Sequence, residues 1–533
     1  MSDGRKLDTK ASGIIALAVM CSRVLGLVRE MLFAGLFGSA LMGIFTIAFR
    51  APNLLRDLFA EGALSTAFIT VFSQKIEKEG DGSAWALASK VMTLAAIFMS
   101  IISLLGVIFA KQLIDILAPG FAVEDAKLTI QLTQIMYPFI LLVSLAALVM
   151  GMLNAKSVFG VPAMASSFFN IGSIAGGVFF GWFFDPSFGE KALIGLAIGT
   201  LVGGLLQFAI QLPSLRRVGY RFRPDFRWND PGIRRILLLM VPSVIAASAV
   251  QINVMVNSSF ASFIGKEAVS WLNFAFRLMQ LPIGVFGVAV ATITLPVVSR
   301  IAAHVDSSEF GPTLGRALRL AIFLTLPAAV GLYFLAQPII AVIYERGEFK
   351  PHDTLQTALA LQFYSLGLVA YSCIKVLSPA FYAIDKKWTP MCVSFAAIGL
   401  NIGLNYLFIF RLGLGHRGLA LATALSASAN FLTLYGLMHR YAGSLESSRL
   451  LNAIFRCGLA SVTLGTVCWL GTIYGSSWVN APGLLPKLAA LFGLIFGAGI
   501  AYLAVCLLLH VEEVVTLRQM VTKRFLRRSQ QGR

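Results

Sequence analysis

Long runs of residues without a charge are the feature that most constrains how this chain can fold. Residues 91–110 lie between Lys90 and Lys111, and residues 320–344 precede Glu345; neither run contains a charged side chain. About 20 apolar residues cross the hydrocarbon core of a bilayer as a helix. Backbone groups in lipid must find hydrogen-bond partners within the protein, which favours helices. Both runs therefore predict membrane-spanning helices.

The composition agrees with this interpretation. Of the 533 residues, 57% are hydrophobic and 13% are charged, whereas soluble domains carry about 25% charged residues. The first apolar stretch has no small-residue cleavage site, so it is predicted to be a membrane span and not a signal peptide. We predict an all-α polytopic membrane protein with about fourteen spans. Their approximate limits are 11–36, 42–72, 86–110, 128–153, 160–184, 192–214, 234–262, 268–299, 317–344, 356–383, 389–410, 418–438, 454–474 and 486–510.

The distribution of Lys and Arg predicts the orientation. An excess of these residues in short connections marks the cytoplasmic side. The sixth connection contains Arg216, Arg217, Arg221, Arg223, Arg227, Arg234 and Arg235, and the tail contains Arg518, Lys523, Arg524, Arg527, Arg528 and Arg533. With an even number of spans, both termini are expected in the cytoplasm. Nucleic-acid binding by the tail is the weaker interpretation, because basic clusters beside a membrane usually meet anionic lipid.

Three weak matches at one offset indicate an internal repeat. Arg50 and Arg277, Gly120 and Gly347, and Tyr137 and Tyr364 are each 227 residues apart. We expect two six-helix lobes of the same orientation, and transporters built from such repeats place their substrate between them. The predicted organisation is an N-lobe at 11–215, a basic cytoplasmic linker at 216–233, a C-lobe at 234–440, two extra helices at 450–510 and a basic cytoplasmic tail at 511–533.

Ionisable residues inside the predicted spans are the candidate substrate site. An Arg at the centre of a span costs about 2.5–3.5 kcal/mol to insert, so several together should face a polar cavity. The cations are Arg23, Arg29, Arg50, Arg56, Arg277 and Lys375, and the anions are Glu30, Asp57, Glu61 and Asp385. Local ion pairs or snorkelling to the interface are the alternative. The excess of cations instead favours a phosphate or pyrophosphate group, which Arg binds with two parallel hydrogen bonds.

Helix-breaking residues stand beside these cations, whereas signs of metal or enzyme chemistry are missing from the sequence. Gly26, Pro52, Pro282 and Gly284 suit bent cavity helices, although both residue types are common in membrane spans. The six cysteines lie in apolar stretches without paired spacing, and the five histidines are scattered. We predict no metal site, no cofactor, no disulfide and no enzyme activity.

Several motifs resemble those of the MurJ/MviN lipid II flippases. Residues 22–30 (SRVLGLVRE) are similar to the first-helix signature of that family, and residues 52–63 (PNLLRDLFAEGA) closely resemble its second-helix signature. Residues 117–121 and 271–282 add further matches. The resemblance extends from about residue 12 to the last span.

This resemblance implies a fold of the multidrug/oligosaccharidyl-lipid/polysaccharide exporter superfamily. The family moves lipid II, an undecaprenyl-pyrophosphate-linked peptidoglycan precursor, from the cytoplasmic to the periplasmic leaflet of the inner membrane by alternating access. The expected partners are lipid II, membrane lipids and the cell-wall synthesis machinery. Two extra helices, here about 454–474 and 486–510, would form a groove for the polyprenyl tail.

The family's cavity residues carry over to specific positions. Arg23, Arg29, Arg56 and Arg277 would hold the pyrophosphate and couple the lobes, while Glu30, Asn53 and Glu61 would position them; Arg50 and Lys375 join the set as further cations inside spans.

Two positions depart from the family pattern. Gly43 stands where many members carry an acidic residue, and Phe276 stands where some members carry one. A sodium site of the kind found in some members would have to use residues that include no carboxylate, namely Asn253, Asn257, Asn401, Asn405 and Thr423.

Other functions remain as alternatives: a flippase of another lipid-linked saccharide, a drug exporter, or a non-transporting membrane scaffold. A scaffold would not need the buried arginines, and an exporter of cationic drugs would favour acidic or aromatic cavity residues.

Overall fold

The computed structural model describes residues 9–58, 64–303, 308–475 and 483–514, and within these ranges the chain is helical without any strand. The all-α class is therefore confirmed. The chain divides into two compact units. The first unit is Met1–Ser270 together with Arg346–Phe349, and the second unit is Trp271–Glu345 together with Lys350–Arg533. Glu61 and the basic tail from residue 515 lie outside the described residues.

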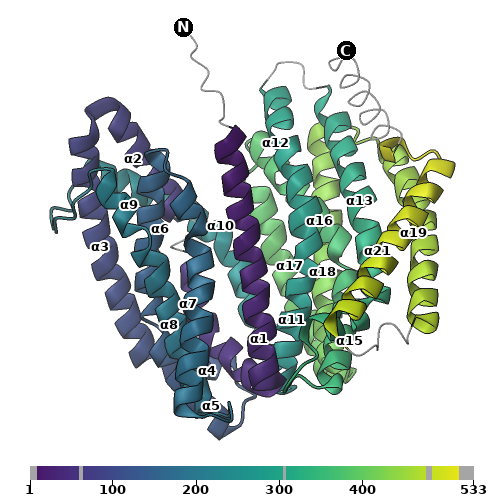
Figure 1. Cartoon of the computed structure of the whole chain (residues 1–533). Coiled ribbons are helices and arrows are strands. Elements are labelled where there is room, and N and C mark those ends of the chain that lie inside the picture. The colour runs from purple at the N-terminus through teal and green to yellow at the C-terminus, as the bar shows by residue number, and fades with distance from the viewer. Residues whose placement is uncertain (1–8, 59–63, 304–307, 476–482, 515–533) are drawn as a thin grey trace, which may run out of the picture. The chain divides into compact units, whose positions relative to one another are not determined.

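Long helices make up the first unit (Figure 1). They are α1 (Thr9–Leu55), α2 (Ser65–Glu79), α3 (Asp81–Ile108), α4 (Ala110–Leu117), α5 (Val123–Met136), α6 (Phe139–Ala155), α7 (Gly160–Phe184), α8 (Ala192–Ala209), α9 (Leu212–Arg217) and α10 (Pro231–Ser262). The buried aromatic residues Phe68 and Phe72 of α2 pack with Leu87 of α3 and Leu148 of α6 to form a core.

The second unit follows with α11, which begins just before the boundary between the units. Its elements are α11 (Lys266–Pro282), the π-helical turn η2 (Ile283–Gly287), α12 (Val288–Ala302), α13 (Phe310–Phe334), α14 (Ala336–Tyr344), α15 (Pro351–Ser365), α16 (Leu368–Ala383), α17 (Trp388–Tyr406), η3 (Leu407–Arg411), α18 (Gly415–Ala442), α19 (Ser447–Tyr474) and α21 (Leu484–Leu508). The turn η2 starts directly after Pro282 and contains Gly284, as expected for helix-breaking residues.

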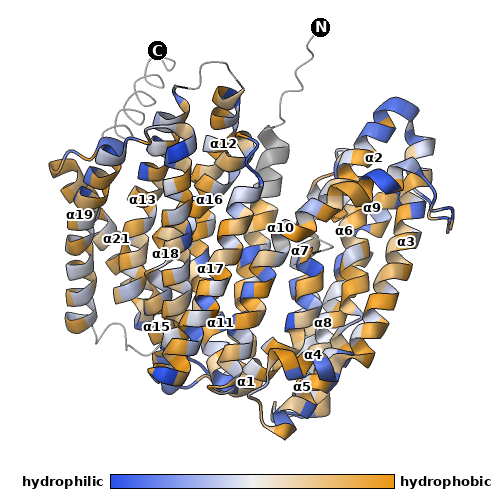
Figure 2. Cartoon of the chain, turned by 180° about the vertical axis from the view of Figure 1, so that it is seen from behind, coloured by the Kyte–Doolittle hydropathy of each residue, from blue (hydrophilic) through white to orange (hydrophobic). Residues whose placement is uncertain are grey.

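The described part of the chain contains eleven helices long and apolar enough to cross a membrane, or twelve if the bent pair α15 and α16 forms one span. Figure 2 shows apolar residues along the helix bodies and hydrophilic residues gathered at many helix ends. The expected number of fourteen spans is not confirmed. The first expected span and the first part of the second lie within one long helix range, which is broken at Gly38 (φ 65°) and runs without interruption through Gly26.

The order of broken helices recurs along the chain. In the first unit, the short helix α4 precedes α5 and α6, which Tyr137 and Pro138 separate. In the second unit, α14, α15 and α16 begin 226, 228 and 229 residues later, and the last two are bent by 46° at their junction. This spacing matches the offset of the sequence repeat. The exact lobe limits, 11–215 and 234–440, stay a prediction.

Glycines bring α7 and α8 into backbone contact. A Cβ atom on Gly199 would lie 2.5 Å from the Cα atom of Gly177, and one on Gly195 would lie 2.5 Å from the carbonyl oxygen of Phe180. The two helices are joined by a short turn in which the Asp185 carboxylate accepts hydrogen bonds from Ser187 and Gly189. This seam forms a closely packed helical hairpin.

A buried arginine fastens the C-terminal helices within the second unit. Arg319 of α13 is 3% exposed. Its guanidinium donates to Glu446, which precedes α19, at 2.7 Å and to Glu513, which follows α21, at 3.2 Å. Arg456 of α19 also donates to the carbonyl oxygen of Leu509 at 2.9 Å. The ends of α19 and α21 are therefore tied to each other and to α13.

This ion pair predicts a dependence of stability on pH. The hydrogen bond from Arg319 holds the pKa of Glu446 below its usual 4.5. A carboxylate with a lowered folded-state pKa contributes stability above its unfolded pKa, and that contribution is lost as the pH falls through the folded value. We expect Glu446→Gln to lower the thermal midpoint at neutral pH and to match the unsubstituted protein only once the pH falls below the lowered pKa of Glu446 in the folded state. Glu190→Gln, an exposed position, is the control; a constant Glu446→Gln difference at all pH values would contradict the prediction.

Candidate functional site

Asp57 is the centre of a polar cluster in the first unit. Its Oδ1 atom accepts from Arg56 Nη2 at 2.9 Å, and its Oδ2 atom accepts from Gln251 Nε2 at 3.1 Å and Asn53 Nδ2 at 3.4 Å. The helix has π-helical geometry at residues 56–58. Arg56 thus has a local counter-charge, as the ion-pair alternative allowed. Gln251 was not among the residues predicted from the sequence, although a glutamine within the apolar helix α10 was a usable signal.

Arg29 lies where α1 contacts α7. Its guanidinium carbon is 5.1 Å from the centre of the Phe169 ring, a cation–π arrangement. One residue further along α7, Asn170 Nδ2 donates to the carbonyl oxygen of Ser22 at 3.1 Å. A Cβ atom on Gly26 would lie 3.6 Å from the same Asn170 nitrogen. A side chain at position 26 would therefore only reach ordinary van der Waals contact with α7, and the aromatic ring orients the guanidinium of Arg29.

The other predicted residues of the first unit differ in exposure. Glu30 is buried at 7% exposure, Arg50 is half-buried, and Arg23 is exposed on α1. Together with Arg29, Asn53 and Arg56, they form a group of polar side chains along both parts of the broken helix α1 and the π-helical turn that follows it. Glu61, the remaining predicted residue of this group, lies outside the described residues.

Two predicted cations belong to the second unit. Arg277 is exposed on α11, and Lys375 is exposed on α16. The neighbouring Phe276 ring packs edge-on against Tyr364 with ring centres 5.4 Å apart. Position 276, where some members of the family that the sequence resembles have an acid, is thus an aromatic packing position in this chain.

Gly43 occupies a position without room for a side chain. A Cβ atom there would overlap the carbonyl oxygen of Lys266, at the start of α11. The Lys266 ammonium group is itself held by Asp125 of α5 at 2.8 Å. Close backbone packing at position 43 therefore explains why this chain has a glycine there and not an acid.

This contact predicts that Gly43→Asp destabilises the protein. The added side chain would force the turn before α11 away from α1, and overpacking of this kind costs about 1–3 kcal/mol or more. We expect a lower thermal midpoint and a lower steady-state membrane level. Gly82→Asp is the matched control because no atom lies within 4 Å of its added Cβ and an acid suits the first turn of a helix. Equal behaviour of the two variants would contradict this account.

The residues considered for sodium are divided between the units. Asn253 and Asn257 lie in the first unit, whereas Asn401, Asn405 and Thr423 lie in the second. Asn405 Nδ2 donates to Asn401 Oδ1 at 2.9 Å, and both side chains are fully buried. Across the described ranges, no group of three or more His, Cys, Asp or Glu residues could hold a metal ion. The contact between Asn401 and Asn405 links successive turns of α17.

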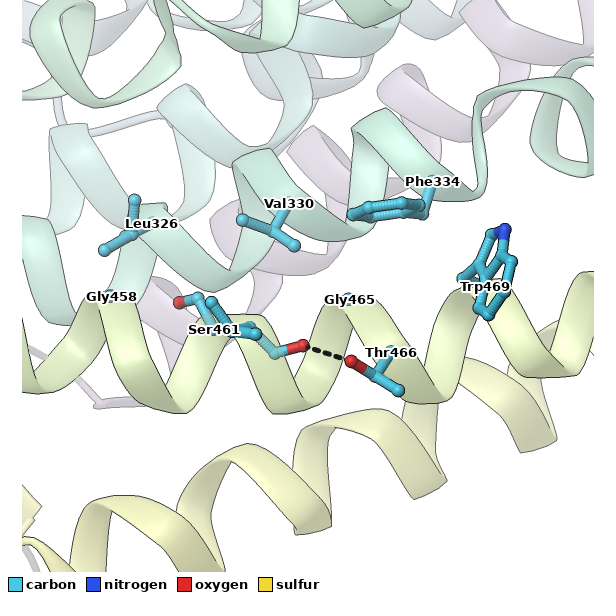
Figure 3. Close-up of a pocket in the computed structure, with 9 residues that line it drawn as sticks. Leu326, Val330, Phe334, Gly458, Ser461, Gly465, Thr466 and Trp469 are labelled. Carbon is cyan, nitrogen blue, oxygen red and sulfur yellow. Dashed lines mark hydrogen bonds between the residues drawn. The ribbon is translucent and has the colours of Figure 1, made fainter.

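An apolar groove of about 380 Å³ lies between α13 and α19 (Figure 3). Figure 3 shows Phe334 and Trp469 at one end and the hydroxyl of Thr466 turned back to its own helix, where it donates to Val462 O at 2.9 Å. The groove is lined by Leu326, Val330, Phe334, Gly458, Ser461, Val462, Gly465, Thr466 and Trp469. Its shape and chemistry suit a hydrocarbon chain.

Comparisons with known proteins agree over nearly the whole chain. The family model described as lipid II flippase MurJ matches residues 33–488. A probable lipid II flippase MurJ of Vibrio cholerae is 36% identical over 515 residues, covering 94% of this chain and 96% of the relative. A lipid II flippase MurJ of Burkholderia cenocepacia is 34% identical over 501 residues, covering 91% and 96%.

Solved structures show the same relationship. A lipid II flippase MurJ in an inward closed conformation matches with a TM-score of 0.75 and 28% identity, covering 95% of this chain and 99% of the other. An inward-facing MATE family transporter of the MOP superfamily has a TM-score of 0.67 at 15% identity, covering 81% and 98%. The second match shows a likeness of fold alone.

Proposed function

The chain belongs to the lipid II flippase MurJ family, and we propose that it moves lipid II from the cytoplasmic to the periplasmic leaflet by alternating access. The observation that carries the proposal is the family match over residues 33–488 together with the arginines on both parts of α1. Transport, and not catalysis, is the activity of this family. The protein would act in peptidoglycan synthesis as a multi-pass protein of the bacterial inner membrane.

The pyrophosphate of the substrate is proposed to bind the arginines. Arg forms paired, charge-assisted hydrogen bonds with phosphate oxygens, and each such bond contributes about 1.5–3 kcal/mol. Arg29 and Arg56 are supported for this role because Phe169 orients the first and Asp57 the second. Arg277 would contribute from the second unit. Arg23, Arg50 and Lys375 would add positive charge, and Glu30, Asn53 and Glu61 would position the arginines.

The polyprenyl tail is proposed to lie in the groove between α13 and α19. The apolar lining of the groove supports this assignment, as does the place of α19 as the first of the two extra helices. Helix α21 contributes no lining residue; it packs against α19 and stabilises it. The substrate's charged and hydrocarbon parts would then bind at separate places.

Both termini are proposed to lie in the cytoplasm. The arginines of residues 216–235 support this orientation through the excess of positive charge on the inner side of membranes. Membrane lipids and the cell-wall synthesis machinery are the proposed partners, and no nucleic acid is expected.

Complementation tests the proposal. A bacterium depleted of its own lipid II flippase would produce this chain while the accessibility of lipid II in the outer leaflet is measured. We expect restored growth together with exposure of lipid II. If the chain reaches the membrane at normal levels and lipid II stays in the inner leaflet, the assignment to lipid II is wrong. Transport of another lipid-linked saccharide or a scaffold role would then take its place.

A further inference from the structure

We propose that residues 216–235, here called the arginine–aromatic segment, form a docking surface for anionic phospholipid headgroups. The segment runs from the end of α9 through an extended stretch into the first turn of α10. The proposal is independent of the transported substrate, because it rests on the surface of the first unit alone.

Exposed cations dominate this surface. All seven of its arginines are exposed: Arg216, Arg217, Arg221, Arg223, Arg227, Arg234 and Arg235. The segment's two acids are each occupied by a basic partner. Asp225 pairs with Arg227 at 2.7 Å, and Asp230 pairs with Lys90 of α3 at 2.6 Å. Six arginines therefore keep their charge for a ligand outside the segment.

Exposed aromatic rings alternate with these arginines. Phe222, Phe226 and Trp228 are 49%, 65% and 39% exposed. A phenylalanine at such exposure in water gains nothing from its position, whereas aromatic side chains are favoured at the membrane interface. The combination of arginine and aromatic residues fits a surface with phosphate groups above and acyl chains below. An acidic protein surface would satisfy the charges only.

Hydrogen bonds hold the segment against α3 at the point where that helix becomes apolar. Tyr220 is buried, and its hydroxyl lies 3.2 Å from Ser89 Oγ. The Asp225 amide donates to Thr93 Oγ1 at 3.2 Å, and Asp230 binds Lys90. The uncharged run of α3 begins directly after Lys90. These contacts place the segment at the depth of the headgroups.

The first turns of helix α10 independently indicate that the segment lies at the depth of the headgroups. Beyond Arg234 and Arg235, after the buried Ile236, come the exposed apolar residues Leu237 and Leu238, at 50% and 65%. The Asp230 carboxylate accepts from Gly232 N at 2.8 Å and caps the helix. Figure 2 shows the hydrophilic stretch after α9 beside α3 and projecting from the helices. The segment is thus a pre-formed surface, which lowers the entropic cost of binding lipid.

The test uses Trp228 as a reporter in the full-length protein, reconstituted in phosphatidylcholine bilayers with a fraction of phosphatidylglycerol. Bromine atoms placed on the acyl chains of one lipid or the other quench nearby tryptophan fluorescence. The Trp228→Phe variant supplies the background from the other tryptophans. We expect brominated phosphatidylglycerol to quench the Trp228 signal several times more strongly than brominated phosphatidylcholine at equal amounts.

The charge dependence is tested with the triple variant Arg217→Gln, Arg221→Gln and Arg223→Gln. We expect its preference for phosphatidylglycerol to fall roughly fivefold or more, because each arginine near an anionic surface adds to the electrostatic attraction and three are removed. The control removes the same charge elsewhere, at the exposed residues Arg300, Arg411 and Arg417. Native mass spectrometry counts retained phosphatidylglycerol as a second readout that does not depend on Trp228.

Two outcomes would overturn the proposal. In the first, both brominated lipids quench Trp228 equally and the triple variant retains as much phosphatidylglycerol as its control. In the second, water-soluble acrylamide quenches Trp228 and neither lipid does. The second result would show that the segment faces water and does not contact the lipid.

Discussion

Replacing Arg29 with alanine is expected to abolish lipid II transport while leaving the protein in the membrane at its normal level. The guanidinium lies over the Phe169 ring on α7, so its loss removes an oriented donor for a pyrophosphate oxygen. A hydrogen bond to a charged group contributes about 1.5–3 kcal/mol, which corresponds to a loss of roughly ten- to a hundredfold in affinity. Arg277→Ala is expected to have the same effect from the second unit. The measurement is growth of the depleted bacterium with outer-leaflet exposure of lipid II.

Two variants make this result specific. Arg29→Lys keeps the charge but lacks the planar donor pair, so we expect partial activity. Arg300→Ala removes an exposed arginine at the end of α12 whose Nε donates to Pro296 O of its own helix, and should transport normally. Activity of Arg29→Ala at the level of the unsubstituted protein, at equal membrane amounts, would remove Arg29 from the site.

A single methyl group on Gly199 is expected to prevent stable folding of the first unit. Its Cβ atom would lie 2.5 Å from the Cα atom of Gly177 and even closer to the Gly177 amide nitrogen. Backbone atoms cannot rotate away as a side chain can, so α7 and α8 would have to separate along their length. We expect a cost at or above the upper end of the roughly 1–3 kcal/mol typical of overpacking, measured as a lower thermal midpoint and loss of monodisperse protein in detergent.

Gly160→Ala supplies the comparison on the same hairpin. Nothing lies within 4 Å of its added Cβ atom, and alanine has the higher helix propensity. We expect this variant to be as stable as the unsubstituted protein or slightly more stable. The close-packing explanation fails if Gly199→Ala and Gly160→Ala unfold at the same temperature.

The class of the protein could be predicted because the length of an apolar run is a local property. The run at 91–110 and the helix α3 agree for this reason. The number of spans could not be fixed in the same way. Residues 17–58 form one candidate span by length and composition, whereas the helix within this range is broken at Gly38.

Partners from distant parts of the chain were beyond the reach of the sequence. The amino-acid pattern suggested that Arg56 would meet a carboxylate, but it could not reveal that Gln251, 194 residues further on, shares that carboxylate. The clash between a side chain at position 43 and Lys266 O likewise depends on how two helices approach. Conversely, the cations themselves were visible because a charge inside an apolar run is conspicuous without any structure.

The carboxylate of Asp57 has a consequence for the half of the transport cycle in which no substrate is bound. After releasing its cargo, a carrier must reorient empty, and a bare guanidinium in a low-dielectric interior opposes that step. Asp57 lies 2.9 Å from Arg56 and, under the proposed function, would act as a resident anion that takes the place of the departed pyrophosphate. The same contact must be exchanged when the next substrate arrives, which weakens net affinity. Under the proposed function, the chain would bind its substrate less tightly, and the empty carrier would return without an external counter-ion at Arg56.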